Sequence, residues 1–556
     1  MNLDPSTVST QPLDHLGLVS AVVQDLGLED KVDSKLPVDA KMGAYVSMGK
    51  RVHAMILNGL GFVNTRLYMF SKFFENKPLS RLLGEGVLAE HLNDDAIGRC
   101  LDSIYEYGCT KFYAEIAASI AVEQKLLGKS IHHDTTTINV EGEYEHSDDS
   151  ASQNSAANKV PPKITYGYSK DHRHDLKQLT LLLTTTGKAG LPIWMEGLDG
   201  NASDKKTLKE AAERVNSFYK KLEQAPKFLH IFDSAYYSQN VASAQEMLWI
   251  TRVPETLLEA RTIVELPDEN ISWIELNNGY KMSAIESNYG DVLQRWLLIF
   301  SQKGYDREVK TLERQIAKEK TEIENQLWHL GNQLFQCPED AKKSLEAFKK
   351  LKFHRVEGTT DAIYKHTTRG RPKPGVEPQV VAYRVQGTIL ADNEKITQYK
   401  RRKGRFILAT NQMDTHELSD GEILQEYKNQ SQVEQGFKLI KSDDFQVSSV
   451  YLKNPSRIEA LMVIMTLCLM VYNIAQHRLR AGLASSNDTL PGPENRPMKN
   501  PTFNSVARLF HGVSMVSIII DCSQKIVREL VCNVNAILRR IIGYFGQNAI
   551  NIYGVT

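Results

Sequence analysis

The stretch "SIHHDTTTINV", residues 130–140, decides the fold, because here the sequence pattern changes from one typical of helices to one typical of strands. Residues 1–125 carry apolar side chains at helical spacing, whereas this stretch is rich in β-branched residues. Asp134 stands near its middle. A charge within such a strand is costly unless a partner or a metal ion compensates it, although a strand-edge or turn position would remove that cost. Asp134 is therefore a candidate site residue.

The elements after this strand predict an α/β fold built on one mixed sheet. Two further strands, 176–186 and 191–200, follow a polar insert, and the three strands together favour an antiparallel meander. A helix at 203–224 comes next, and then the strands 227–237 and 247–254 with a short helix between them. Three strands followed by alternating helix and strand form the RNase H-like pattern, a mixed five-stranded sheet with helices on its faces.

The domain organisation follows from where this pattern breaks and returns. A chain of 556 residues exceeds one core, so several domains are expected. After residue 254 come a hairpin with an Asn-Gly turn and two helices that could pair, and then the strand "RFILATN", 405–411, returns to the core. We expect an α-helical N-terminal domain at 1–125, the first part of an RNase H-like catalytic core at 126–253, an insertion with a hairpin and a helical hairpin at 254–400, the second part of the core at 401–484, and a linker with C-terminal helices at 485–556.

Composition excludes several classes of protein. Lysine and arginine together number 67, as do aspartate and glutamate, so positive charge for a nucleic-acid partner has to be local. The six cysteines show no CxxC spacing, which favours a reducing cytoplasm and argues against a disulfide scaffold or a zinc–cysteine site. The first residues lack the basic and apolar regions of a signal peptide. The uncharged stretch 460–476 has 17 residues, and we interpret it as a buried core helix and not as a membrane span.

Two further carboxylates join Asp134. Asp233 ends an apolar strand, and Glu434 lies in the helical stretch "EYKNQSQVEQGFKLIKSD", 426–443, after the final strand. In an RNase H-like sheet the first strand runs beside the fourth, so Asp134 and Asp233 would be adjacent, and Glu434 would face both. Taken alone, Asp233 could cap the helix after it, and Glu434 could form a surface pair with Lys438.

The helix around Glu434 has two faces. Tyr427, Glu434 and Lys441 are seven residues apart, which turns each only about 20° from the last, and Gln430 lies beside this stripe. An apolar stripe lies roughly 100° round the helix and consists of Val433, Phe437 and Ile440. Glu434 is therefore expected at the shoulder of a buried face.

Three converging carboxylates repel one another, and a divalent cation that prefers oxygen relieves the repulsion. Mg²⁺, with Mn²⁺ as a substitute, suits such a site better than zinc, and two ions would activate a nucleophile and stabilise a leaving 3′ oxygen. His132, His133, His172 and His174 have irregular spacing and no cysteine partners, so we interpret them as structural or DNA-facing.

The motifs resemble those of a known family. "HHDTTT", "FDSAYYS" and 426–443 look like the three catalytic blocks of DDE insertion-sequence transposases. More closely, the chain resembles the IS-four-like superfamily with the Y-x2-R-x3-E-x6-K signature, in the branch called the sixteen-thirty-four type. Tyr427, Glu434 and Lys441 match that signature, whereas Gln430 stands where the family has arginine.

The resemblance implies a transposase that binds the inverted repeats at the element ends as a homodimer, cleaves there and joins the 3′-OH to double-stranded target DNA. It implies that Asp134, Asp233 and Glu434 are catalytic and hold Mg²⁺, and that Tyr427 and Lys441 contact phosphates, with the role of Gln430 open. By the same analogy the N-terminal helices bind the element end.

The insertion would help to hold the element end as well. Trp273 or Trp296 could stack there on a displaced base, or both could pack in the core.

Two basic runs supply local positive charge. "TTRGRPKPG", 367–375, resembles an AT-hook core and contains Arg369 and Arg371. "KRRKGR", 400–405, contains Arg401 and Arg402. We expect DNA contact from both, and a solvated loop is the alternative for each.

Three hypotheses for the function remain from the sequence. The first is the Mg²⁺-dependent transposase, acting in a prokaryotic cytoplasm and associated with the nucleoid when bound to DNA, without a membrane partner. The second is an RNase H-like nuclease that cuts without strand transfer. The third is a catalytically silent DNA-binding protein of transposase descent, which the intact set of three carboxylates disfavours.

Overall fold

The computed structural model describes residues 8–37, 46–62, 70–142, 144, 160–222, 227–237, 247–366, 370–371, 375, 377–442, 452–492, 496–519 and 526–555. The chain divides into two units, each of which is described by itself. Unit 1 comprises Met1–Ile250 and Leu424–Thr556, and unit 2 comprises Thr251–Ile423. The insertion expected at 254–400 thus lies within unit 2, which continues to residue 423.

Unit 1 is built on a mixed sheet. Its strands, in the spatial order β4-β3-β2-β5-β6, are Leu191–Leu198, Lys177–Thr186, Ser130–Val140, Leu229–Phe232 and Leu248–Val253, of which the last begins in unit 1 and ends in unit 2. β2 pairs antiparallel with β3 and parallel with β5, and β3 pairs antiparallel with β4. The predicted α/β class and mixed sheet are confirmed, and this arrangement is consistent with an RNase H-like fold.

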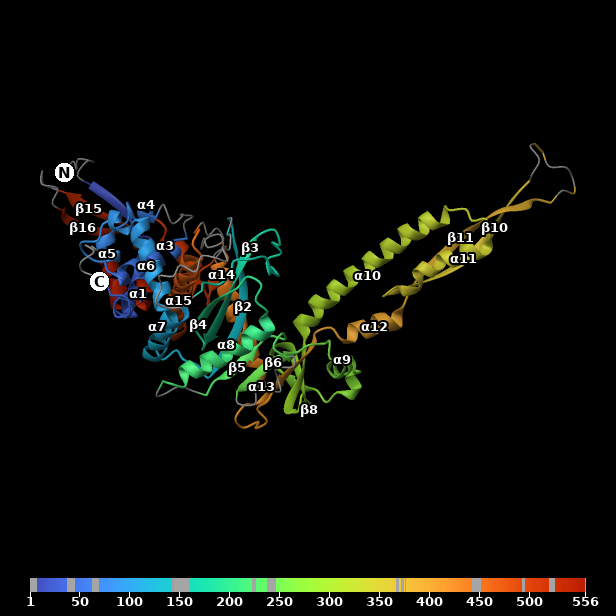
Figure 1. The fold of residues 1–556 in the computed structure, drawn as a ribbon, viewed down its shortest axis with the longest axis horizontal. Coiled ribbons are helices and arrows are strands. Elements are labelled where there is room, and N and C mark those ends of the chain that lie inside the picture. Colours follow the sequence, from blue (N-terminus) through green and yellow to red (C-terminus); the bar gives the residue numbers. More distant parts are fainter. Residues whose placement is uncertain are drawn as a thin grey trace. The chain divides into compact units, whose positions relative to one another are not determined.

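Helices bury the strands of this sheet (Figure 1). α7 (Cys109–Glu123) and α15 (Pro455–Ser485) pack on β4, while α8 (Asp204–Tyr219) and α14 (Ser431–Ile440) pack on β2. Because helices cover it, β3 is buried along nearly its whole length and carries a nearly continuous apolar and threonine sequence, without the alternation of a half-exposed strand.

α15 is the central helix of unit 1. By length and composition it is the one helix among the described residues that could cross a membrane, and 83% of its most apolar window is buried inside the protein. The helices around it are α1 (Leu16–Asp25), α3 (Met48–Gly59), α6 (Asp94–Tyr107) and α7. These helices from the N-terminal region bury their apolar faces on α15, which has the surroundings of a core helix.

The two ends of the chain meet in unit 1. β1 (Val8–Pro12) pairs antiparallel with β15 (Ser514–Ile519), and β15 pairs with β16 (Ile526–Cys532). The C-terminal region expected to form helices does contain α16, α17 and α18, but it also contains the strands β15 and β16, which were not expected. The other short elements of this unit are α2 (Leu28–Asp33), α4 (Phe70–Phe74), α5 (Leu79–Leu82), β13 (Leu490–Pro491), β14 (Pro497–Met498), α16 (Phe503–Ala507), α17 (Ala536–Tyr544) and α18 (Gln547–Tyr553).

Unit 2 contains an antiparallel run of strands, β12-β9-β8-β7. These strands are Arg405–Thr410, Val292–Ser301, Tyr280–Tyr289 and Ile274–Leu276. β7 and β8 form the hairpin expected at the Asn-Gly turn, where Asn278 and Gly279 have φ angles of 64° and 74°. The strand expected to return to the core, β12, pairs with β9 of unit 2.

A long helix and a two-stranded ribbon complete unit 2. α10 (Gln302–Gly331) lies alongside the ribbon of β10 (His354–Lys365) and β11 (Gln379–Ala391), as Figure 1 shows. The predicted helical hairpin was wrong, because the segment 340–351 forms only the end of α11 (Pro338–Ser344) and a 3₁₀ turn, and the ribbon buries the apolar face of α10. Three further helices are α9 (Leu258–Glu265), α12 (Asn393–Arg401) and α13 (Asp420–Asn429), which begins in unit 2 and ends in unit 1.

Close packing of α14 on α15 provides a test of the fold. A Cβ atom at Gly436 would lie 3.0 Å from Leu469 Cδ2, whereas at Gly421 of α13 nothing lies within 4 Å. Gly436→Leu should overpack this contact and destabilise the protein by about 1–3 kcal/mol. Thermal unfolding followed by circular dichroism should therefore show a lower midpoint for Gly436→Leu and an unchanged or higher one for Gly421→Leu. Equal midpoints for the two variants would contradict the close packing.

Candidate active site

The parallel pairing of β2 and β5 sets the geometry of the site. The register joins Ser130 with Leu229 and continues to His132 with Ile231. Two residues further along the same register, Asp134 is level with Asp233, which follows the last residue of β5. The two aspartates therefore lie level with each other on neighbouring strands, Asp134 within β2 and Asp233 just after β5, as expected for the first and fourth strands of an RNase H-like sheet.

A buried stack of rings joins the two strands just before these aspartates. His133 Nε2 lies 3.0 Å from His230 Nδ1, and Thr184 Oγ1 of β3 lies 2.9 Å from His133 Nδ1. The ring of His133 stacks on that of Phe232 with 4.9 Å between centroids, and Phe232 stacks on Tyr236 at 3.8 Å. Since the strands are connected by side chains as well as by the backbone, the spacing of the aspartates is fixed.

The buried histidines are uncharged at neutral pH. Burial lowers the pKa of His132 and of His230 to about 4. Burial, with His230 and His132 nearby, holds the pKa of His133 well below its usual value. These rings therefore have a structural role and offer no positive charge to DNA, whereas His172 and His174 are exposed.

Each aspartate also accepts a hydrogen bond from the backbone just after it. Asp134 Oδ1 accepts a hydrogen bond from the backbone N–H of Thr135 at 2.7 Å, and Asp233 Oδ1 accepts one from Ala235 at 2.9 Å. Lys170 places its ammonium 3.9 Å from Asp134 Oδ1 and donates to the carbonyl and hydroxyl oxygens of Thr135 at 2.8 and 2.7 Å. The positively charged ammonium group of Lys170 therefore lies beside Asp134.

The helix that carries Glu434 is divided in two. α13 ends at Asn429 and α14 begins at Ser431, with Gln430 between them in a tight turn. Gln430 N–H donates to Tyr427 O and Gln430 O accepts from Val433 N–H, both across three residues, which is 3₁₀ geometry. Tyr427 therefore lies in α13, whereas Glu434 lies in α14 with Lys441 at its C-cap, and the turn at Gln430 interrupts the single helix on which this stripe was expected. Asparagine and serine at this junction are weak helix formers.

α14 presents Glu434 from beside the sheet. Val433, Phe437 and Ile440 are buried as predicted, α14 packs on β2 and β3, and Glu434 is exposed at the shoulder of this face. Among the described residues, no three His, Cys, Asp or Glu side chains lie close enough together to hold a metal ion. The structure thus places the two aspartates on neighbouring strands and packs the helix of Glu434 against their sheet. The three carboxylates do not lie close enough together to form one set of metal ligands.

Lys441, at the end of α14, is engaged by the loop before β3. Its ammonium lies 2.8 and 2.7 Å from the two carboxylate oxygens of Asp171. Asp171 follows Lys170, so adjacent residues of one loop contact Lys441 through a carboxylate and Asp134 through an ammonium. The sequence interpretation missed both loop residues, and the only signal for them was the charged run "SKDHRHD", 169–175, before a predicted strand.

The comparisons with known proteins bear on this arrangement. The family model of the transposase DDE domain matches residues 131–473, which is more than half of the chain. The chain belongs to the transposase DDE domain family. A domain of unknown function, DUF4277, matches residues 8–118. No curated protein matches the chain.

A solved structure is also similar to the chain. It is described as a cryo-EM structure of the piggyBac transposase synaptic complex with hairpin DNA, at 9% sequence identity and a TM-score of 0.36, covering 90% of this chain and 81% of that one.

Family membership supports part of what the sequence predicted. It implies a transposase, and DDE transposases generally use divalent metal ions. The finer assignment to the branch with the tyrosine, arginine, glutamate and lysine signature is not tested by the family match.

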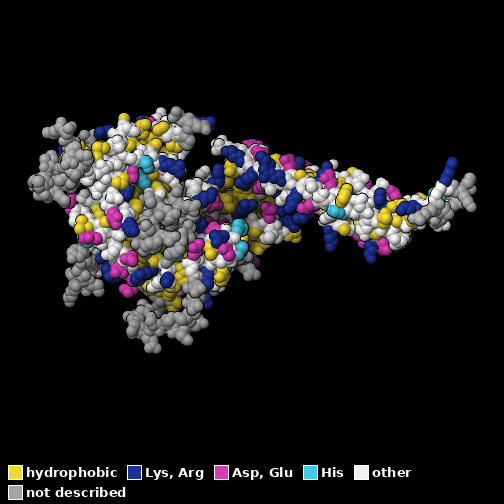
Figure 2. Space-filling model, turned by 90° about the horizontal axis from the view of Figure 1, so that it is seen from above, with side chains coloured by type: hydrophobic (Ala, Val, Ile, Leu, Met, Phe, Trp, Pro, Cys, Tyr) yellow, Lys and Arg dark blue, Asp and Glu magenta, His cyan; other side chains and the backbone are white. Residues whose placement is uncertain are grey.

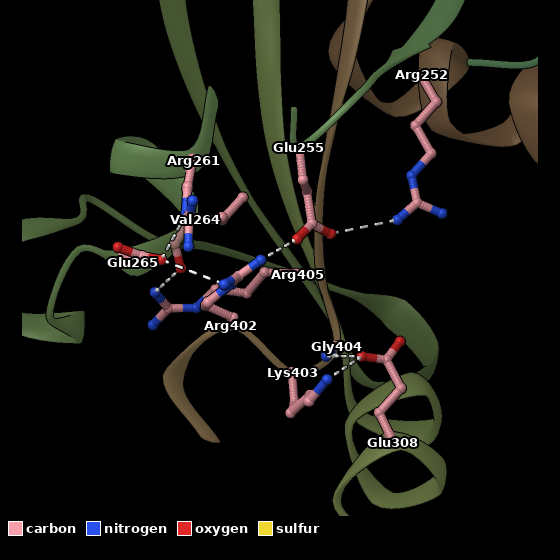
Figure 3. A network of polar contacts seen from close by, with 10 residues as sticks. All are labelled: Arg252, Glu255, Arg261, Val264, Glu265, Glu308, Arg402, Lys403, Gly404 and Arg405. Carbon is pink, nitrogen blue, oxygen red and sulfur yellow. Dashed lines mark hydrogen bonds and ion pairs between the residues drawn. The ribbon is translucent and has the colours of Figure 1, made fainter. Parts of the chain in front are cut away.

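In this DDE-domain protein, several residues of the second basic run, 400–405, form ion pairs and hydrogen bonds within unit 2 (Figure 3). Arg402 lies 2.7 Å from Glu255 Oε2 and 3.4 Å from Glu265 Oε1. Arg405 is buried and donates to the carbonyl oxygen of Val264 at 3.0 Å. It also donates to the carbonyl oxygen of Leu266 at 2.6 Å.

DNA contact by Arg402 therefore competes with a structural role. Arg401 and, in the first run, Arg371 are exposed, so DNA contact by these two residues stays a prediction, whereas Arg369 lies outside the described residues.

The two tryptophans are held within unit 2. Trp296 is 0% exposed, and its indole N–H donates to Gln294 Oε1 at 3.1 Å, so the suggestion that it stacks on a displaced base was wrong. Trp273 lies partly exposed, and the Arg405 guanidinium lies 5.7 Å from the centre of its ring. The alternative of core packing therefore holds for Trp296.

The basic run supplies a matched pair of substitutions. Arg405→Gln should leave the buried carbonyl group of Val264 and the partly buried one of Leu266 without their donor, and should destabilise unit 2 by about 1–3 kcal/mol. Arg401→Gln removes the same charge from an exposed position and should change stability by less than about 0.5 kcal/mol. Limited proteolysis should then cleave unit 2 of the Arg405 variant faster. Equal cleavage rates for the two variants would contradict a fastening role.

The contact between Asp171 and Lys441 provides another test. Asp171→Asn removes the carboxylate that competes with an anionic ligand for Lys441, so the affinity for a DNA duplex should rise several-fold. In a Lys441→Gln background the same substitution should have no effect on affinity. Fluorescence anisotropy of a labelled duplex at fixed salt measures both, and an equal gain in the two backgrounds would contradict this coupling.

Proposed function

We propose that the protein is the DNA transposase of an insertion sequence, of the branch with the tyrosine, arginine, glutamate and lysine signature. It binds the terminal inverted repeats as a homodimer, cleaves the DNA and joins the 3′-OH to double-stranded target DNA. We place this activity in a prokaryotic cytoplasm. The scattered cysteines support a reducing compartment.

One observation carries the proposal. The register of β2 and β5 puts Asp134 level with Asp233, one on each of two neighbouring strands, in a chain whose residues 131–473 match the DDE domain. Two carboxylates on neighbouring strands repel each other, and a protein keeps such a pair where a cation compensates it. Packing of α14 on β2 supports Glu434 as the third member of the set.

The residues suit a divalent metal ion. Carboxylates offer only oxygen, which is the donor that Mg²⁺ and Mn²⁺ prefer, and the ammonium of Lys170 already compensates charge beside Asp134. Asp134, Asp233 and Glu434 would together hold two divalent metal ions. A bound divalent ion lowers the pKa of a water or hydroxyl nucleophile and stabilises the leaving 3′ oxygen.

The protein's own residues hold the DNA and the geometry. The ring stack of His133, His230 and Phe232 keeps the aspartates at a fixed spacing, which preserves the alignment that phosphoryl transfer needs. Lys441 exchanges Asp171 for a DNA phosphate, and Lys170 is displaced from Asp134 or donates to the same phosphate. Tyr427 supplies a further phosphate contact, and a neutral Gln430 in the turn replaces the cation of the signature.

Strand transfer by the purified protein tests the proposal. Wild type with Mg²⁺ and labelled element-end duplex should produce cleaved ends and joined products, and Asp233→Asn should reduce the yield of both by about a hundredfold or more. Asp175→Asn is the control, because Asp175 is an exposed carboxylate paired with Arg173 in the loop before β3.

Three outcomes would count against the transposase. If Asp233→Asn matches wild type, the catalytic assignment is wrong. Cleavage without joining would point to the nuclease alternative, and binding without cleavage would point to a silent DNA-binding protein.

A further inference from the structure

The N-terminal half of α10 in unit 2 carries a stripe of positive charge. Lys303, Arg307, Lys310 and Arg314 are spaced by four, three and four residues, so they project within about 60° of one another on the helix. All four side chains are exposed, and dark-blue side chains gather over this part of the helix in Figure 2. We call these four residues the basic stripe.

The basic stripe faces away from the packed side of α10. Leu312 and Ile323 are the buried residues of the helix, and each is turned about 160–180° from the stripe. β11 packs on α10. Burial of the apolar side fixes the rotation of the helix, so the stripe has to stay in solvent or meet a partner.

The charges of the stripe are not compensated within the part of the chain that the structure describes. None of the four forms an ion pair there, whereas further along the same helix Lys318 lies 3.8 Å from Glu322 and Lys320 lies 3.8 Å from Glu324. Like charges three or four residues apart cost a few tenths of a kcal/mol for each pair.

The position within the helix adds a further cost. The first turn of α10 contains no acidic residue and does contain Lys303, which also opposes the helix dipole. An uncompensated row of this kind is suited to a polyanion.

We propose that the basic stripe binds the phosphate backbone of double-stranded DNA, outside the candidate active site. From Lys303 to Arg314 the helix rises about 16 Å, the length along the duplex axis of about five phosphates of one strand. The chemistry is that of a non-specific track, since lysine and arginine on phosphate position a protein without reading sequence. The inference rests on the proposed function in one respect, which is that the polyanion bound by the basic stripe is DNA.

Salt dependence of binding by the full chain tests the stripe. The quadruple variant Lys303→Gln, Arg307→Gln, Lys310→Gln and Arg314→Gln keeps side chains that favour helix. With a labelled 30-base-pair duplex of mixed sequence in EDTA, the slope of log K against log salt concentration should fall in magnitude by about 3–4, close to 0.9 for each phosphate that the variant no longer neutralises. Arg314→Gln alone should lower it by about one, which keeps the test valid if the quadruple variant folds poorly.

A control variant separates the stripe from net charge. Lys320, Lys342, Lys343 and Lys350 are exposed in the same unit and away from the stripe, and their replacement by glutamine removes the same charge. The control should change the slope by less than one. A slope unchanged in the stripe variant, or lowered as much in the control, would overturn the inference.

The failure of this inference can be told apart from that of the proposed function. If wild type binds the duplex and the stripe variant has the same slope, only the stripe is wrong, because no metal and no cleavage enter the measurement. A wild-type protein that binds neither this duplex nor element-end DNA contradicts the proposed function and the stripe together.

Discussion

The parallel pairing of β2 with β5 is the constraint on which the candidate site depends. It places Asp134 and Asp233 level with each other on neighbouring strands, where their two negative charges repel each other. The neutral rings of His133 and His230 lie directly behind them and cannot relieve that repulsion. A positive charge that offsets this repulsion has to come from outside the two strands, and Lys170 in the loop before β3 supplies it.

That loop explains how the site can be stable without its ligands. Lys170 supplies a positive charge to Asp134, and Asp171 supplies a negative charge to Lys441, the residue expected to meet DNA. Both interactions are partly exposed, so each contributes little stability and can be exchanged at little cost. The site can therefore accept a metal cation and a DNA phosphate together. The cation would replace Lys170 beside Asp134, and the phosphate would replace Asp171 beside Lys441.

The sequence revealed the chemistry of the site better than its surroundings. Asp134 and Asp233 were predictable because a carboxylate within or at the end of an apolar strand is conspicuous, and the order of the elements placed them together. The break at Gln430 depends on a local turn that helical periodicity does not register. β10 and β11 were missed because most of their residues are exposed and neither strand shows a regular alternation of apolar and polar side chains. Gly358 and Gly387 also interrupt them, where Leu345 and Leu327 approach the backbone. Nor could local sequence reveal that Arg402 and Arg405 have partners about 140 residues away.

The position of α15 in the chain has a consequence for the synthesis of the protein. The helices of the N-terminal region end with α7 at residue 123, and the helix on which they bury their apolar faces begins at residue 455. At about 5–20 residues per second, a ribosome needs roughly 17–66 seconds to make the intervening segment. During that interval these helices can pack on one another, and α7 can pack on β4, but the faces that meet α15 in the folded protein lack that partner. The N-terminal helices can therefore reach their final packing only late in synthesis, after α15 has been made.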